Sequence, residues 1–264
     1  MNGPVIEVRD LHARYGQRAV LHAVNLTVQP GEIRVIMGGS GSGKTTLLRH
    51  LLGLNHAERG EVRVLGRDLC RMTEEEIDAL RRQIGVSFQG GALFNSMTVG
   101  ENVALPLREH ATLDESTLQV MVRLKLEVVS LAGFENLMPA QLSGGMVKRA
   151  ALARAIALDP KLLFFDEPSA GLDPVVAVEL DELILKLRDA LRMTIVVVTH
   201  ELESAFKIAD TITVLDAGEN LMTGTVAEVR ATSNERIQDL LNRRPREVTV
   251  DADAYLKRLT EEEA

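Results

Sequence analysis

A glycine-rich segment near the start of the chain has the residue types and spacing that bind phosphate groups. A glycine, four further residues and then Gly-Lys-Thr lie between the apolar run 33–37 and an amphipathic stretch at 45–52, which predicts a strand, a loop and a helix in that order. Glycines let the loop backbone turn N–H groups toward a phosphate, Lys44 adds a positive charge, and the Thr45 hydroxyl can ligate Mg²⁺. The residues expected to bind a nucleotide here are Gly38, Gly39, Ser40, Gly41, Ser42, Gly43, Lys44, Thr45 and Thr46.

A pair of carboxylates ends a second apolar run. Four apolar residues at 162–165 lead directly into Asp166 and Glu167, which predicts that both lie at the carboxyl edge of a buried strand, where α/β sheets gather ligands. An acidic pair at a strand end is more often simply solvated, and the phosphate loop elsewhere in the chain reverses that preference. We expect Asp166 to hold the Mg²⁺ shell and Glu167 to orient or deprotonate an attacking water.

A second short glycine motif, Ser143-Gly144-Gly145, begins an alanine-rich stretch about one helix length before the Asp166 strand. A serine at this position can cap a helix whose first N–H groups form a second anion site. One nucleotide does not need two phosphate sites in one chain unless the second serves a neighbouring chain. A plain helix cap with glycines for close packing is the alternative.

Over about residues 5–230 these motifs resemble the ATPases of ABC transporters. In that family the Ser143-type loop closes on ATP bound to the opposite protomer, so the resemblance implies a head-to-tail dimer of two copies that binds ATP and Mg²⁺. The resemblance also implies that Lys44, Gln89, Glu167 and His200 are catalytic, that Thr45, Gln89 and Asp166 contact the metal, that residues 169–173 run along the dimer seam, and that Tyr15 stacks on adenine. Without the resemblance, His200 would be an ordinary strand-end residue, Tyr15 a core residue beside a turn, and Asp173 a helix cap.

Residues 89–110 are similar to the ATPases of MCE-type lipid transporters, and most of all to those of the bacterial maintenance-of-lipid-asymmetry (Mla) system. Met146 supports the resemblance to this subfamily, whose signature continues Gly-Gly-Met where most ABC signatures have Gln after the two glycines. The alternative is that Met146 only fills space on the core-facing side of the helix. The resemblance implies an ATPase that powers phospholipid transport between the inner and outer membranes. Its implied partners are an integral permease, a periplasmic MCE-domain protein and a small STAS-domain subunit. The alternative is the ATPase of a small-solute importer.

The composition limits the partners and the compartment. A net charge of −8 and a pI near 5.4 argue against broad binding to nucleic acid or anionic lipid, and the length leaves no room for a second cassette or long coiled-coil insertions. No run approaches the ~18 apolar residues that span a bilayer, no signal pattern opens the chain, and Cys70 has no partner cysteine. We therefore expect a peripheral protein on the cytoplasmic side of the inner membrane, held there only by partners.

The expected fold is α/β: a P-loop NTPase (RecA-like) parallel-sheet core with an N-terminal antiparallel β subdomain and an inserted α-helical subdomain. Strands at 5–8 and 24–28 are expected on either side of a turn at 16–17, and the runs 33–37, 162–165 and 195–198 lack alternation, as strands buried on both faces do. A helical subdomain is expected at about 90–157. One helix is expected at 144–158, at the end of this subdomain, and another from Asp173 onward. The expected domains are 1–231, the nucleotide-binding domain, and 232–264, a C-terminal extension that clasps the second protomer through Tyr255 and Leu256 or else forms a solvated tail.

Overall fold

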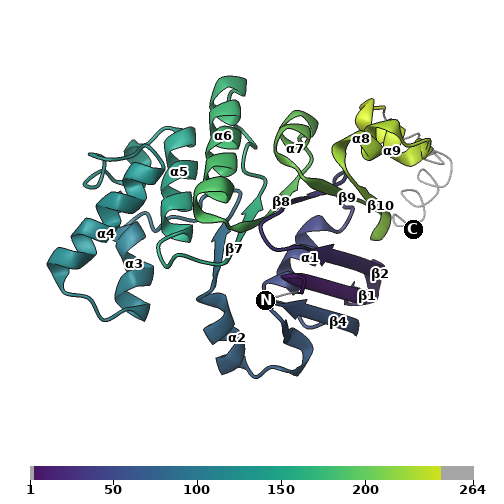
Figure 1. The fold of residues 1–264 in the computed structure, drawn as a ribbon, viewed down its shortest axis with the longest axis horizontal. Coiled ribbons are helices and arrows are strands. Elements are labelled where there is room, and N and C mark those ends of the chain that lie inside the picture. The colour runs from purple at the N-terminus through teal and green to yellow at the C-terminus, as the bar shows by residue number, and fades with distance from the viewer. Residues whose placement is uncertain (1–2, 245–264) are drawn as a thin grey trace, which may run out of the picture.

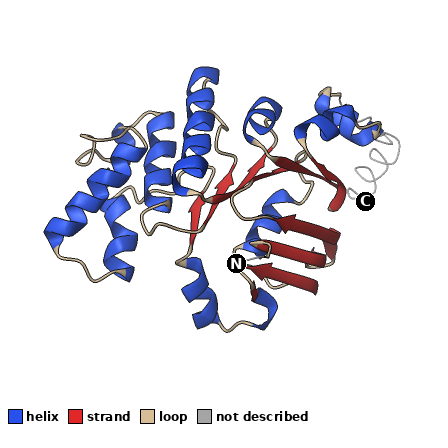
Figure 2. Cartoon of the chain, viewed as in Figure 1, coloured by secondary structure: helices blue, strands red, loops and turns tan. Residues whose placement is uncertain are grey.

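Two β-sheets and the helices around them form the described part of the chain, which is residues 3–244 of the computed structural model (Figures 1 and 2). A smaller antiparallel sheet has the strand order β2-β1-β4-β5, and a larger sheet has the order β10-β9-β3-β8-β7-β6. Helix α1 (Lys44–Leu51) lies between the two sheets, and α3 to α7 lie on the other side of the larger one (Figure 1). The predicted fold class is confirmed.

The smaller sheet contains β1 (Ile6–Tyr15), β2 (Arg18–Val28), β4 (Arg59–Val64) and β5 (Arg67–Asp68). The predicted turn at 16–17 does join β1 to β2, but both strands are longer than their alternating ends at 5–8 and 24–28 suggested. The register shifts after Val8 and again near Ala13, and Asp10 and Ala23 have positive φ angles of 49° and 52°. Bulges of this kind interrupt the period-2 pattern, so alternation alone could not reveal the full strands.

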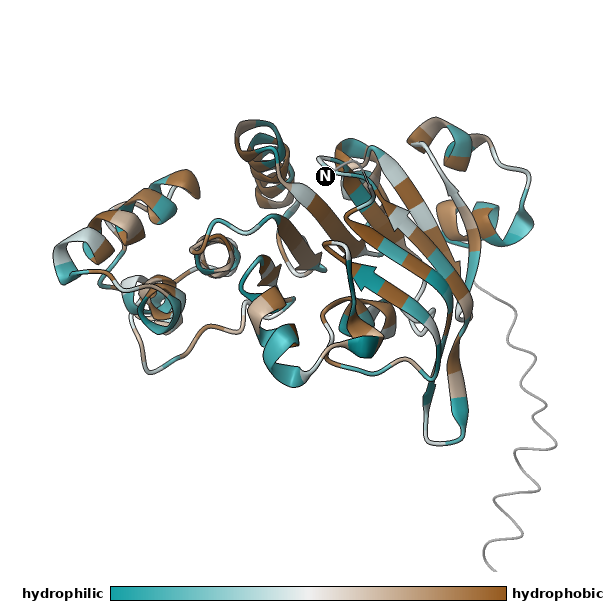
Figure 3. Ribbon diagram, turned by 60° about the horizontal axis from the view of Figure 1, so that its bottom comes forward, coloured by the Kyte–Doolittle hydropathy of each residue, from teal (hydrophilic) through white to brown (hydrophobic). Residues whose placement is uncertain are grey.

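The central strands of the larger sheet are buried on both faces. Its strands are β3 (Ile33–Met37), β6 (Ile84–Ser87), β7 (Leu162–Asp166), β8 (Thr194–Thr199), β9 (Thr211–Asp216) and β10 (Glu219–Gly224). All neighbouring pairs are parallel except the β9–β10 hairpin. Alternate side chains enter two cores: Phe165 packs with the helices and Phe164 with α1 and the smaller sheet. Figure 3 shows hydrophobic strands, coloured brown, at the centre of the molecule.

A group of helices is inserted between β6 and β7, as predicted. It contains α3 (Val99–His110), α4 (Glu115–Val128) and α5 (Gly144–Ala155), and it lies at the left of Figure 1. The other helices are α2 (Glu74–Arg81), α6 (Pro174–Leu191), α7 (Leu202–Ile208), α8 (Val226–Ala231) and α9 (Glu235–Leu241), with short 3₁₀ turns at Leu69–Arg71 and Pro139–Gln141. Helix α5 ends at Ala155, before the expected residue 158. Within residues 3–244, no helix has the length and apolar character needed to cross a bilayer.

The part of the expected C-terminal extension that the structure describes packs on the rest of the chain. Ile237 of α9 is fully buried in the core on the helix side of the larger sheet. Arg236 places a guanidinium nitrogen 2.5 Å from a carboxylate oxygen of Asp216, at the end of β9. The division at residue 231 stays a prediction, and Tyr255 and Leu256 lie outside the described residues.

This packing predicts different effects for two truncations. Ending the chain at residue 231 removes Ile237 from the core, and we expect it to lower the free energy of unfolding by about 2 to 4 kcal/mol. Ending it at residue 244 keeps every described contact of α9 and should leave the value unchanged. Urea unfolding of both variants checks this; equal stability of the two would show that α9 does not contribute to the core.

Candidate active site

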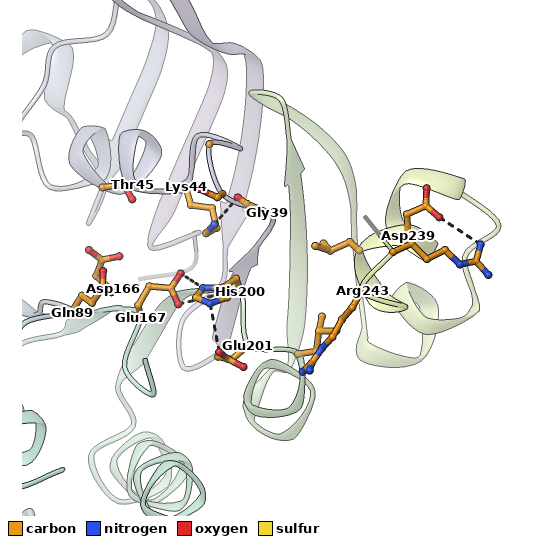
Figure 4. Close-up of a pocket in the computed structure, with 15 residues that line it drawn as sticks. Gly39, Lys44, Thr45, Gln89, Asp166, Glu167, His200, Glu201, Asp239 and Arg243 are labelled. Carbon is orange, nitrogen blue, oxygen red and sulfur yellow. Dashed lines mark hydrogen bonds and ion pairs between the residues drawn. The ribbon is translucent and has the colours of Figure 1, made fainter. Parts of the chain in front are cut away.

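The predicted phosphate loop joins β3 to α1 and surrounds the floor of a cavity of about 710 Å³ (Figure 4). Gly43 immediately precedes α1 with a φ of 102°, a left-handed conformation that glycine adopts without strain. A Cβ on Gly38 would lie 2.2 Å from the carbonyl oxygen of Leu215, so only glycine fits there. The Ser42 hydroxyl is buried and has no hydrogen-bond partner among the described residues. A curled backbone, a helix N-terminus and an unpaired buried donor together fit a bound phosphate.

Lys44 brings a positive charge to this floor. Its Nζ donates hydrogen bonds to the carbonyl oxygens of Gly38, at 2.8 Å, and of Gly39, at 3.0 Å. Burial lowers the pKa of Lys44, while the carboxylates of Asp166 and Glu167 act in the opposite direction. The ammonium group is therefore held by the loop that it would help to bind phosphate.

Asp166 ends β7, Glu167 follows it directly, and both line the same cavity. Burial raises the pKa of Asp166, and the neighbouring Glu167 raises it further, whereas Lys44 and Lys148 oppose the shift. Glu167 is 9% exposed, and one of its carboxylate oxygens lies 2.8 Å from Nδ1 of His200. The other accepts hydrogen bonds from the Thr199 hydroxyl, at 3.1 Å, and from the His200 backbone N–H, at 3.3 Å. The end of β8 thus fixes the Glu167 carboxylate (Figure 4).

Oxygen donors from three elements line the cavity near Asp166. Gln89 follows β6, and Thr45 is the second residue of α1. Within residues 3–244, no cluster of three or more His, Cys, Asp or Glu residues could hold a metal ion alone. Mg²⁺ typically takes one or two carboxylates and completes its shell with water and substrate phosphates. The hydroxyl, amide and carboxylate present here fit Mg²⁺ bound together with a nucleotide.

Tyr15 ends β1 at the rim of a second cavity, which also contains Gly43, Lys44 and Thr45. The residue is 47% exposed, so it is not a core residue. Its hydroxyl accepts hydrogen bonds from the Asn55 amide, at 3.0 Å, and from Arg49, at 3.4 Å. The exposed ring lies beside the phosphate loop, and its stacking on adenine stays a prediction.

The Ser143 motif lies apart from the 710 Å³ cavity that Asp166 and Glu167 line. The Ser143 hydroxyl accepts a hydrogen bond from the Met146 N–H, at 3.3 Å, and so caps α5 as predicted. A Cβ on Gly145 would meet Val176 of α6 at 2.6 Å, which explains that glycine by close packing. Ser143 and Gly144 are exposed, and none of the three motif residues lines the cavity that holds Lys44. Asp173 caps α6 by accepting N–H groups of Val175 and Val176, each at 3.1 Å.

Two contributors to the site were not predicted from the sequence. One wall of the cavity comes from α9 and the residues after it, through Asp239, Leu240, Arg243 and Arg244. No local pattern could reveal this, because tertiary packing alone brings α9 there. The other is Lys148 of α5, whose Nζ donates to backbone carbonyls of Gln89 and Glu167. A lysine within an alanine-rich helix was the available signal.

The comparisons with known proteins agree with this geometry. Residues 21–170 match the family model described as ABC transporter. The chain belongs to the ABC transporter family. As an ABC protein it carries an ATP-binding cassette that couples ATP hydrolysis to transport.

Relatives and solved structures cover most of this ABC cassette. The chain is 42% identical over 241 residues to the intermembrane phospholipid transport system ATP-binding protein MlaF of Haemophilus influenzae, covering 91% of each chain. It is 40% identical over 235 residues to a protein of Mycobacterium tuberculosis described as a probable ribonucleotide transport ATP-binding protein, mkl, covering 89% of this chain and 65% of that one. The ATP-binding cassette MJ0796, solved as a post-hydrolysis dimer with ADP and Pi, superposes with a TM-score of 0.77 at 31% identity, over 84% of this chain and 98% of the other.

The phosphate loop yields a prediction with a matched control. Gly38→Ala places a methyl group against the Leu215 carbonyl, so we expect it to lower the free energy of unfolding by about 1 to 3 kcal/mol. Nothing lies within 4 Å of a Cβ on Gly39, so Gly39→Ala should change that value by less than about 0.5 kcal/mol. Urea unfolding without nucleotide measures both; equal stabilities would contradict the close approach of Gly38 to β9.

Proposed function

We propose that this chain hydrolyses ATP to power phospholipid transport between the inner and outer membranes through a separate permease. The observation that carries the proposal is its likeness to MlaF across 91% of both chains. A solute-importer ATPase is the second candidate, because the mycobacterial relative named for ribonucleotide transport is nearly as identical. That likeness covers a smaller share of the relative, and phospholipid is therefore the favoured cargo.

The residues predicted from the sequence each have a task in this proposal. The loop N–H groups and Lys44 bind the phosphates of ATP, and the exposed ring of Tyr15 stacks on adenine. Thr45, Gln89 and Asp166 would hold Mg²⁺, which when bound neutralises charge on the phosphates. Glu167 orients or deprotonates the attacking water, and His200 positions Glu167 and contacts the γ-phosphate. The 2.8 Å contact between Glu167 and His200 supports this pairing.

A second copy of the chain completes the site in this proposal. Ser143, Gly144 and Gly145 carry N–H groups at the start of α5 but do not line the cavity of their own chain. Placed head to tail, each copy would direct this helix N-terminus at the ATP of the other. Residues 232–264 are also proposed to contact the second copy. The truncation at residue 244 tests part of this contact, because unchanged dimer assembly and ATPase rate would exclude residues 245–264 from it.

The permease is expected to dock beside Gln89, on the cytoplasmic side of the inner membrane. A groove of about 580 Å³ lies between α2, β6, α3 and α5. Its lining combines Phe88 and Pro106 with the cations Arg82 and Arg154, and with Arg81, which pairs with Asp78 at 2.7 Å. An apolar and basic groove fits a cytoplasmic segment of a membrane protein that carries apolar and acidic side chains. A periplasmic MCE-domain protein and a small STAS-domain subunit would join through this assembly.

Changing Glu167→Gln should separate ATP binding from hydrolysis. The amide keeps the shape of the side chain but is not a base, so we expect ATP to remain bound and the rate to fall by about 10²- to 10⁴-fold. The variant should accumulate as an ATP-bound dimer, seen by size-exclusion chromatography with radiolabelled ATP. Lys44→Ala is the control, because it should weaken ATP binding itself. Normal turnover by the Glu167→Gln variant would exclude Glu167 from the reaction.

Isolating the chain from detergent-solubilised native membranes tests the cargo. We expect a permease to co-purify together with an MCE-domain protein, and a solute permease with a substrate-binding protein would support the importer instead. Phe88→Glu places a negative charge in the groove and should reduce recovery of the permease at least about tenfold. Leu191→Glu is the matched control, since Leu191 is exposed but does not line the groove.

A further inference from the structure

Lys148 is a buried cation to which the proposed mechanism gives no task. It lies on α5, five residues after Ser143, and is 7% exposed. Its Nζ donates hydrogen bonds to the backbone carbonyl of Gln89 and, at 3.2 Å, to that of Glu167. Burial lowers the pKa of Lys148, while Asp166 and Glu167 oppose that shift. Burying a charge is costly unless it is paired and hydrogen-bonded, and here both acceptors belong to residues of the candidate active site.

Helix α5 holds the segment after Gln89 at further points. The Arg154 guanidinium donates to the carbonyl oxygens of Ala92, at 2.7 Å, and of Gly91, at 3.0 Å. Gly91 also lies so close to Val147 that a Cβ would approach its Cγ1 to 2.8 Å. Residues 89–92 are therefore fixed to α5 from its second turn to its last. Of Lys148 and Arg154, only Lys148 also donates a hydrogen bond to Glu167.

The Glu167 backbone needs such support. Its φ is 48°, in the left-handed region that a residue with a Cβ adopts only at a cost. The Glu167 N–H donates to the Val198 carbonyl at 2.8 Å, and Thr199 and His200 hold its carboxylate. Lys148 holds the carbonyl oxygen. The residue is thus fixed by β8 through its N–H and side chain, and by α5 through its carbonyl.

We propose that Lys148 is a positioning residue that fixes Gln89 and Glu167 of its own chain to the helix that begins at Ser143. The inference rests on the proposed function, in which Ser143 contacts ATP on the second copy. One rigid helix then joins two reaction centres: its N-terminus faces the partner's nucleotide, and Lys148 holds the groups that act on the nucleotide of its own chain. The alternative is that Lys148 only stabilises the fold.

Steady-state kinetics of Lys148→Met, measured on the chain assembled with its permease, tests the proposal. We expect kcat to fall at least about tenfold, while KM and the affinity for a fluorescent ATP analogue change less than about twofold, because the phosphate loop keeps its contacts. Lys148→Arg keeps the charge and the donors and should recover most of kcat.

Arg154→Met is the matched control, compared at equal permease content because Arg154 also lines the proposed docking groove. It removes the bonds to Gly91 and Ala92 but leaves the bond from Lys148 to Glu167. Its loss of kcat should therefore be smaller than that of Lys148→Met. Thermal unfolding of both variants separates positioning from stability. Equal losses of kcat that follow equal losses of melting temperature would overturn the proposal, as would a wild-type kcat for Lys148→Met.

Two further variants separate the role of Lys148 from misfolding and from failure of the proposed function. If Lys148→Met does not fold, Lys148→Leu, whose shorter side chain also has no donor, should show the same selective loss of kcat. A folded Leu variant with normal kcat overturns the proposal. If Glu167→Gln traps ATP as expected while Lys148→Met turns over normally, only the role of Lys148 fails. If Glu167→Gln itself hydrolyses ATP normally, the proposed function of Glu167 fails first.

Discussion

Two adjacent carboxylates, partly withdrawn from water at the end of one strand, are the constraint on which the rest of this structure depends. Burial raises the pKa of Asp166, and the charge of the neighbouring Glu167 raises it further. Lys44 approaches from the phosphate loop and Lys148 from α5, and both favour the ionised state of Asp166. The same burial lowers the pKa of each lysine. Asp166 and the two lysines therefore favour each other's charged forms, and a defined geometry must hold them together beside Glu167.

The fold supplies that geometry through strands that are buried on both faces. Because β7 lies between β6 and β8, its last residues are fixed on either side by the ends of two neighbours, which carry Gln89 and His200. Parallel strands bring their carboxyl ends to one edge, so residues far apart in sequence meet there. The helices inserted between β6 and β7 then reach the same edge through α5. The insertion and the sheet meet at Gln89 and Glu167, where movement of one would displace the other.

The sequence predicted the parts of this arrangement that depend on local patterns. The glycine loop, the apolar runs and the serine and aspartate caps each carry their own signal, and the family resemblance supplied Gln89 and His200, which share one cavity with Lys44, Asp166 and Glu167. What sequence could not show depends on tertiary contacts or local backbone shape. The bulge at Asp10 hid most of β1, burial of Ile237 brought α9 to the cavity wall, and the hydrogen bond from Lys148 to Glu167 joins residues 19 positions apart.

Charge gives one reason for the proposed head-to-tail pair. The triphosphate is strongly anionic, yet the carboxylates that line the cavity, Asp166, Glu167, Glu201 and Asp239, outnumber its Lys and Arg cations, Lys44, Arg243 and Arg244. The Lys44 ammonium also donates to its own loop. The N-terminus of α1 and a Mg²⁺ ion offset part of this repulsion. The start of α5, with exposed Ser143 and Gly144, is a further electropositive helix end, and it lies outside the cavity of its own chain. In the proposed head-to-tail pair, a second copy would bring this helix end to each of the two nucleotides at once.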